Sequence, residues 1–178
     1  PGSVNYQKMV SELRDRGARV LPYVMGWMWN GASEDFRLRG AKEKGAMLGE
    51  DGESVLWAEL EPSEENIAMC PASKIWRDKL TDVTVEFIQH YRTGGIYFDY
   101  FSTHMADCFN PTHGHALGGG DYWARGVHDL FQQVRDGARK ADPEAMLCAE
   151  DLAEFCIDVL DAAYVGITAD APVWQAVY

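Results

Sequence analysis

The chain has 178 residues and is 47% apolar, and its 28 acidic and 16 basic residues give a formal net charge of −12. An acidic surplus argues against a nucleic-acid partner, because binding to phosphates needs clustered Lys and Arg side chains. No stretch approaches the roughly 20 apolar residues of a membrane span, and the N-terminal residues show no signal-peptide pattern.

The first part of the chain predicts a helix, a short strand and a long loop. Residues 6–16 place apolar side chains at helical spacing, and Gly17 follows as a residue that ends helices. Residues 18–25 are mostly apolar and too few for a helix, which favours a strand of a buried parallel sheet. Residues 30–72 show no sustained periodicity, so we expect a long functional loop there.

Helices and strands alternate along the rest of the chain. The expected elements are a helix over 74–92, a strand over 95–101, a loop over 102–120, a helix that begins after Asp121, a strand over 145–150, a short helix over 152–160 and strands over 163–167 and 173–178. Such alternation implies parallel strands joined by helical crossovers. Long loops follow the strands, which is typical of a (β/α)8 barrel with its site at the carboxyl ends of the strands.

We therefore expect an α/β fold, with residues 1–178 forming one incomplete catalytic domain, roughly the middle strands of a (β/α)8 TIM barrel. A complete barrel takes about 250 residues, so the missing strands would come from the rest of a longer chain or from a partner chain. A doubly wound open sheet is the alternative, but no G-x-G-x-x-G motif follows a strand.

Two predicted strands end in a carboxylate. Asp99 follows the apolar run at the start of the strand over 95–101, and Glu150 ends the strand over 145–150. Both acids should therefore lie at the same edge of the sheet. A pair of carboxyl groups across a cleft is what cleavage of a glycosidic bond requires. Each acid could instead only cap the loop or helix that follows it. Glu154, four residues after Glu150, could line the same edge.

Aromatic and histidine residues surround these strand ends. Flat aromatic faces stack on sugar rings, and polar side chains bind the hydroxyl groups. The candidate substrate-binding residues are Tyr23, Trp27, Trp29, Asn30, Tyr97, Tyr100, His113, His115 and Glu154. Trp76 and Trp123 lie in helical stripes and are expected in the core.

His113 and His115 could also face a metal, and Cys108, Asp107 and His104 lie nearby as further ligands. We expect one or both histidines to bond to sugar hydroxyl groups instead, and a structural role in which they fix their own loop stays open. No residue is therefore assigned to a metal, and no cofactor is expected. Cys148 and Cys156 are typical of small core residues, whereas a disulfide between Cys70 and Cys108 stays open.

The run Gly95-Ile96-Tyr97-Phe98-Asp99-Tyr100-Phe101 resembles the nucleophile strand of retaining barrel glycoside hydrolases of the α-amylase and α-galactosidase kinds. Residues 113–123, with Ala149-Glu150 and residues 175–178, resemble poorly characterised bacterial glycosidase-like barrels. The α-amylase clan carries an Arg where this chain has Tyr97. The resemblance therefore implies a barrel and a carboxylate pair rather than a starch-like substrate.

The leading hypothesis is a glycoside hydrolase that acts on an oligosaccharide or glycoside, with Asp99 as the nucleophile of a retaining mechanism and Glu150 as general acid/base. One alternative is a metal-dependent hydrolase that uses His113 and His115 with an acid such as Asp99 or Asp107. A second alternative is a carbohydrate-binding barrel without catalytic activity. Neither a nucleic-acid partner nor a membrane is expected.

Overall fold

The computed structural model describes residues 4–56, 66–99, 105–150 and 153–164. In chain order its elements are α1 (Val4–Asp15), β1 (Tyr23–Met25), β2 (Met28–Asn30), α2 (Glu34–Leu38), α3 (Ala41–Gly45), β3 (Asn66–Ala68), α4 (Lys74–Tyr91), β4 (Gly95–Asp99), α5 (Tyr122–Ala141), β5 (Met146–Glu150), the 3-10 helix η1 (Glu154–Cys156) and β6 (Ala162–Tyr164). In this part of the chain, no helix is both long and apolar enough to cross a membrane.

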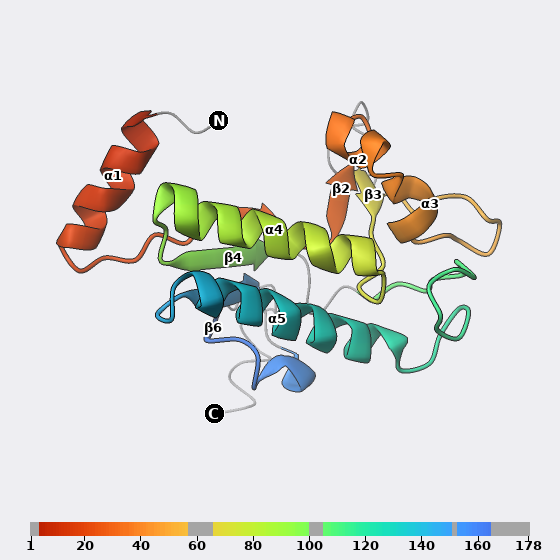
Figure 1. Cartoon of the computed structure of the whole chain (residues 1–178). Coiled ribbons are helices and arrows are strands. Elements are labelled where there is room, and N and C mark those ends of the chain that lie inside the picture. The colour runs from red at the N-terminus through yellow and green to blue at the C-terminus, as the bar shows by residue number, and fades with distance from the viewer. Residues whose placement is uncertain (1–3, 57–65, 100–104, 151–152, 165–178) are drawn as a thin grey trace, which may run out of the picture.

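Four strands form a parallel sheet in the order β1-β4-β5-β6. The order follows the chain, and α4 and α5 lie side by side in front of the sheet in Figure 1. A doubly wound sheet would reverse its strand order at a switch point and carry helices on both faces. Winding in one direction with these two helices on one face is instead the arrangement of consecutive units in a (β/α)8 barrel.

The core lies between this sheet and the two long helices. Alternate residues of the central strands point to the helices, and Ile96, Phe98, Leu147 and Ala149 are completely buried. The ring of Phe98 packs on that of Phe131 from α5, with 5.8 Å between the ring centroids. The expected core positions Trp76, in α4, and Trp123, in α5, are 2% and 3% exposed, which confirms that prediction.

The first residue of β4 must be a glycine. Gly95 has a φ of 146°, and a Cβ there would lie 1.9 Å from the carbonyl oxygen of Met146 on β5. The missing side chain lets the two strands pair from their first residues.

The predicted loop over 30–72 contains regular structure. β2 and β3 pair antiparallel, with Met28 opposite Ala68, and the short helices α2 and α3 lie beside them (Figure 1). Met47, between α3 and β3, is completely buried. The described part of this segment is therefore a small packed layer rather than an irregular loop, and the prediction is wrong on that point.

Three other expected elements differ from the structure. The first strand is shorter than predicted and begins at Tyr23, directly after Pro22, which has no backbone N–H to donate. Of the helix expected over 152–160, the structure shows the single turn of η1. The strand expected over 173–178 lies outside the described residues.

Candidate active site and a Cys/His cluster

Two acidic residues end adjacent parallel strands. The register pairs Tyr97 with Cys148 and Phe98 with Ala149. Continued by one residue, it sets Asp99 at the end of β4 opposite Glu150 at the end of β5. Neighbouring strands lie about 4.8 Å apart, so both carboxylates leave the same edge of the sheet, on the face away from α4 and α5. The expected adjacency of the two strand ends is confirmed, while the catalytic roles stay a prediction.

Asp99 is buried and hydrogen-bonded through both its side chain and its backbone. It is only 5% exposed, and the hydroxyl group of Tyr23 donates a hydrogen bond to its Oδ2 atom. Its backbone oxygen accepts a hydrogen bond of 3.0 Å from the amide of Gly26, which follows β1. Burying a carboxylate is costly unless it is hydrogen-bonded, and the bond from Tyr23 meets that requirement.

Tyr97 lies two residues before Asp99 on β4 and therefore on the same face of the sheet as the two acids. Burial, followed by the negative charges of Glu150 and Asp99, raises the pKa of Tyr97 to about 12. The phenol is therefore a neutral hydrogen-bond donor or acceptor near neutral pH. The negative charges of both carboxylates therefore act on the same tyrosine.

Three tyrosine rings, from β1, β4 and β6, lie next to one another on the face of the sheet that carries the acids. The ring centroids of Tyr23 and Tyr97 are 5.9 Å apart, and those of Tyr97 and Tyr164 are 6.4 Å apart. Tyr23 and Tyr164 are 57% and 61% exposed. We name Tyr23, Tyr97, Asp99, Glu150 and Tyr164 the tyrosine–carboxylate face. Tyr164 was not among the predicted site residues, although the register that sets it opposite Glu150 follows from strand alternation.

Trp27 and Trp29, predicted to stack on a sugar, belong to the core instead. They are 3% and 7% exposed, and Trp27 packs edge-on against Trp123 with 6.2 Å between centroids. Trp29 packs on Phe36 and Trp76 at 5.5 and 5.7 Å. The prediction of a stacking surface is corrected for both rings, because Trp27 packs on α5 and Trp29 packs on α2 and α4.

Asn30 and Glu154, two of the remaining predicted residues, lie on elements outside the four-stranded sheet. Asn30 ends β2, where its Oδ1 accepts a hydrogen bond of 2.8 Å from the amide of Ala32. Glu154 is exposed on η1. Tyr100 lies outside the described residues.

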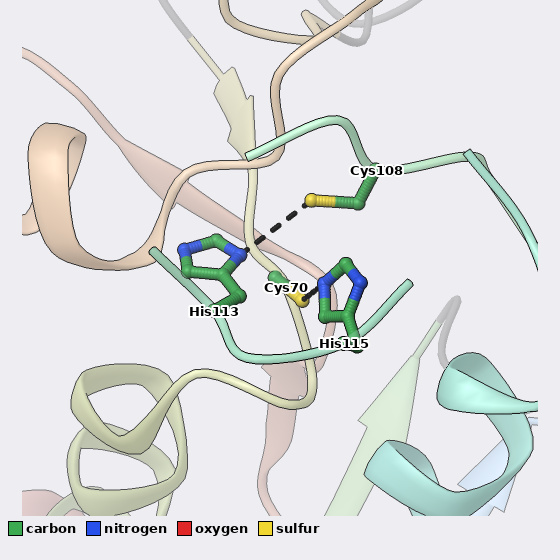
Figure 2. Close-up of side chains that lie close together, drawn as sticks. All are labelled: Cys70, Cys108, His113 and His115. Carbon is green, nitrogen blue, oxygen red and sulfur yellow. Dashed lines mark hydrogen bonds between the residues drawn. The ribbon is translucent and has the colours of Figure 1, made fainter. Parts of the chain in front are cut away.

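His113 and His115 meet two cysteines that are distant in sequence. Figure 2 shows their rings directed at the thiols of Cys70 and Cys108. Nε2 of His115 lies 3.4 Å from Sγ of Cys70, and Nδ1 of His113 lies 3.5 Å from Sγ of Cys108. One ligand atom from each of the four residues lies within 4.8 Å of the others. We name these four residues the Cys/His cluster.

Both cysteines of the cluster are buried and free, so the structure does not pair them in a disulfide. The Cys70 thiol donates to Cys108, and this bond, with help from His113, lowers the pKa of Cys108. The same bond and burial raise the pKa of Cys70. Cys148 and Cys156 are buried outside the cluster, which confirms them as core residues.

Packing fixes the histidine and cysteine side chains from several sides. The His115 ring stacks on Tyr122 with 4.0 Å between centroids and 14° between planes. The amide of Cys70 donates a hydrogen bond of 2.9 Å to the carbonyl of Gly45 at the end of α3. A Cβ on Gly126 of α5 would lie 2.9 Å from the amide nitrogen of Ala72, so this glycine lets the helix approach the segment that follows Cys70.

The family model described as "Domain of unknown function (DUF6259)" matches residues 1–175. Two relatives are named as glycoside hydrolases. A "Putative glycoside hydrolase" of Bacteroides thetaiotaomicron is 30% identical over 93% of this chain and 24% of its own length. A "Putative glycoside hydrolase 22789" of Monosiga brevicollis is 22% identical over 99% of this chain and 16% of its own length. The chain thus spans less than a quarter of either relative.

Solved structures with a similar fold are also glycoside hydrolases. The α-galactosidase TtGalA of Thermus thermophilus matches 90% of this chain and 29% of its own with a TM-score of 0.63 and 14% identity. The glycoside hydrolase domain of PelA from Pseudomonas aeruginosa matches 88% of this chain and 54% of its own with a TM-score of 0.58 and 14% identity. At such identities the likeness concerns the fold, a mixed α/β arrangement with a parallel sheet.

Proposed function

The chain belongs to the DUF6259 family, and we propose that it forms part of the catalytic (β/α)8 barrel of a glycoside hydrolase. One observation carries the proposal: Asp99 and Glu150 end adjacent parallel strands in register, on the face that the two long helices leave uncovered. In a barrel this face points inward, and the carboxyl ends of the strands hold the active site. The names of the relatives agree with this activity.

In the proposed reaction Asp99 attacks the anomeric carbon, while Glu150 gives a proton to the leaving oxygen and later activates water. Retaining glycosidases hold their two carboxyl groups about 5–5.5 Å apart, and inverting ones hold them about 6.5–9.5 Å apart. Strand neighbours about 4.8 Å apart at the backbone favour the shorter separation and hence retention.

The surroundings of Asp99 suit its proposed role. The Tyr23 hydroxyl group donates a hydrogen bond to its Oδ2 atom, which fixes the orientation of the side chain that would attack the anomeric carbon. Tyr23 therefore acts as a positioning residue for Asp99.

The tyrosine–carboxylate face also offers binding groups for a sugar. The exposed rings of Tyr23 and Tyr164 present flat apolar surfaces with a hydroxyl group at the tip. Tyr97 stays neutral beside the acids and can bond to a sugar hydroxyl. We propose that a glycoside lies across these rings with its scissile bond above Asp99 and Glu150. The remaining barrel strands would come from sequence outside β1, β4, β5 and β6, or from a partner chain.

The metal-dependent alternative receives less support. His113 and His115 face two cysteine thiols, and no carboxylate belongs to that group of ligand atoms. The pocket beside the histidines, of about 290 Å³, is lined by the loop around Gly114 and the start of α5 rather than by Asp99 or Glu150. The histidines are therefore not placed to deliver a metal-bound water to the acid pair.

A panel of aryl glycosides of both anomeric series, offered to the full-length protein, tests the proposal. Wild type should release the aryl group from at least one substrate, and Asp99→Asn should abolish this release. Glu86→Gln, an exposed acid on α4, is the matched control and should keep the activity. NMR detection of the first-formed anomer then distinguishes retention from inversion. Sugar binding of equal affinity in wild type and Asp99→Asn without any hydrolysis would instead establish a non-catalytic binding barrel.

A further inference from the structure

We propose that Cys70, Cys108, His113 and His115 bind a Zn²⁺ ion as a closed, four-ligand structural site. The inference does not depend on the proposed glycosidase activity, because none of the four residues belongs to the tyrosine–carboxylate face.

The spacing of the ligand atoms fits a tetrahedral ion. Zinc binds Cys sulfur at about 2.3 Å and His nitrogen at about 2.0–2.1 Å, so the edge of a tetrahedron that joins S to N is about 3.5 Å. The two sulfur–nitrogen distances in the cluster are 3.4 and 3.5 Å. All four ligand atoms lie within 4.8 Å of one another, which leaves room for one ion at their centre.

The four side chains are held in the orientation that a metal needs. Nδ1 of His115 lies 2.7 Å from the carbonyl oxygen of Ala116, so Nδ1–H can donate there and leave the Nε2 lone pair directed at Cys70. A second hydrogen bond of this type fixes the tautomer of most metal-binding histidines. The stack on Tyr122 fixes the plane of the same ring.

The backbone of both cysteines is also fixed. The amide and the hydroxyl group of Ser73 donate to the carbonyl oxygen of Cys70 at 3.0 and 2.7 Å. The amide of Gly118 donates to the carbonyl oxygen of Cys108 at 3.0 Å. Both cysteines are therefore held where their sulfur atoms can bind one ion.

Without an ion, the cluster would bury polar groups that have weak partners. A thiol is a weak donor and a weak acceptor of hydrogen bonds. Nδ1 of His113 nevertheless has the sulfur of Cys108 as its hydrogen-bond partner. A zinc ion bound at Nδ1 would replace this weak contact by a strong bond.

The donor set indicates both the ion and its role. Two thiolates and two imidazoles in a tetrahedral arrangement select zinc among the common divalent ions. Four protein ligands leave no position for water or substrate, which is the property of a structural site. Cys70 precedes α4, whereas the other three ligands lie between β4 and α5, so the ion would fasten the loop that follows the Asp99 strand to the β2–β3 layer. The pocket lined by His113 and His115 provides an entry path.

The test uses the protein purified under reducing conditions. Wild type should contain one zinc per chain, lose it to a strong chelator and rebind it. Replacement by Co²⁺ should give the intense visible bands of tetrahedral cobalt together with a thiolate-to-cobalt charge-transfer band. Cys108→Ser and His115→Gln should weaken zinc binding by more than about 100-fold, beyond the loss usual for a residue that only supports a ligand.

The matched controls are Cys148→Ser, a buried cysteine outside the cluster, and His128→Gln, a histidine on α5. Both should keep one zinc and the cobalt spectrum. If a ligand variant fails to fold, the cobalt spectrum of wild type decides alone. A wild type that binds neither ion in a one-to-one ratio would overturn the proposal, as would a spectrum unchanged in Cys108→Ser. A Cys70–Cys108 disulfide found under these conditions would also overturn it.

Discussion

Replacing one acid of the proposed catalytic pair should stabilise the protein. Asp99 is 5% exposed and lies opposite Glu150 on the neighbouring strand, so two negative charges share a poorly solvated edge of the sheet. Active sites often keep such unfavourable arrangements, and neutralising them trades activity for stability. Asp99→Asn keeps the shape of the side chain and an oxygen that can accept the bond from Tyr23.

The size of the effect follows from the strand spacing. Two unit charges about 5 Å apart repel by about 3 kcal/mol at an effective dielectric constant of about 20, and by about 1 kcal/mol in bulk water. Against this, a neutral amide accepts a weaker hydrogen bond from Tyr23 than a carboxylate does, which costs about 1 kcal/mol. The net gain in unfolding free energy should reach up to about 2 kcal/mol, or a Tm rise of up to about 8 °C.

Thermal and urea unfolding of wild type, Asp99→Asn, Glu150→Gln and the double variant measure this effect. Because either single change removes the repulsion, the double variant should gain little more than the singles, giving a coupling energy of about 1–3 kcal/mol. Glu154→Gln, on exposed η1, should change stability by less than about 0.5 kcal/mol. Destabilisation by Asp99→Asn, with effects that add in the double variant, would refute the argument and favour a purely structural acid.

Two further predictions concern the same face of the sheet and the approach of α5. Glu150→Gln should lower the pKa of Tyr97 from its value of about 12, because the Glu150 charge helps to raise it; NMR titration of the tyrosine ring measures this, and an unchanged pKa would place the two groups apart. Gly126→Ala should lower the Tm, because its Cβ would lie 2.9 Å from the backbone nitrogen of Ala72. Such overpacking costs about 1–3 kcal/mol, against a gain of about 1 kcal/mol from the higher helix propensity of alanine. A more stable Gly126→Ala protein would show that α5 does not approach so closely.

Local patterns in the sequence predict much of the sheet and its helices. The stripe of apolar residues in α5 and the buried runs of β4 and β5 specify one element each, so their order and the adjacency of Asp99 and Glu150 follow from the chain. Alternation along β4 separates Phe98, which packs on Phe131, from Tyr97 and Asp99 on the opposite face.

Features that depend on distant contacts are not predictable in this way. Trp27 and Trp29 follow a strand end, as substrate-binding rings would. Only the packing of α5 on Trp27, and of α2 and α4 on Trp29, shows that they are core residues. The Cys/His cluster joins Cys70 to a segment near His115, and nothing in the local sequence of Cys70 indicates that meeting. The antiparallel β2–β3 pair is too short to give a clear periodicity.

The central claim is that Asp99 and Glu150 cleave a glycosidic bond together. The dependence of the hydrolysis rate on the leaving group tests this claim most directly. It compares wild type with Glu150→Ala on aryl glycosides whose phenols are weakly or strongly acidic. Loss of a general acid typically costs about 10²–10⁴-fold in rate. We predict a loss of this size for the weakly acidic phenol and a much smaller loss for the strongly acidic one, which leaves without a proton. An equal loss for both substrates, or none, would contradict the account.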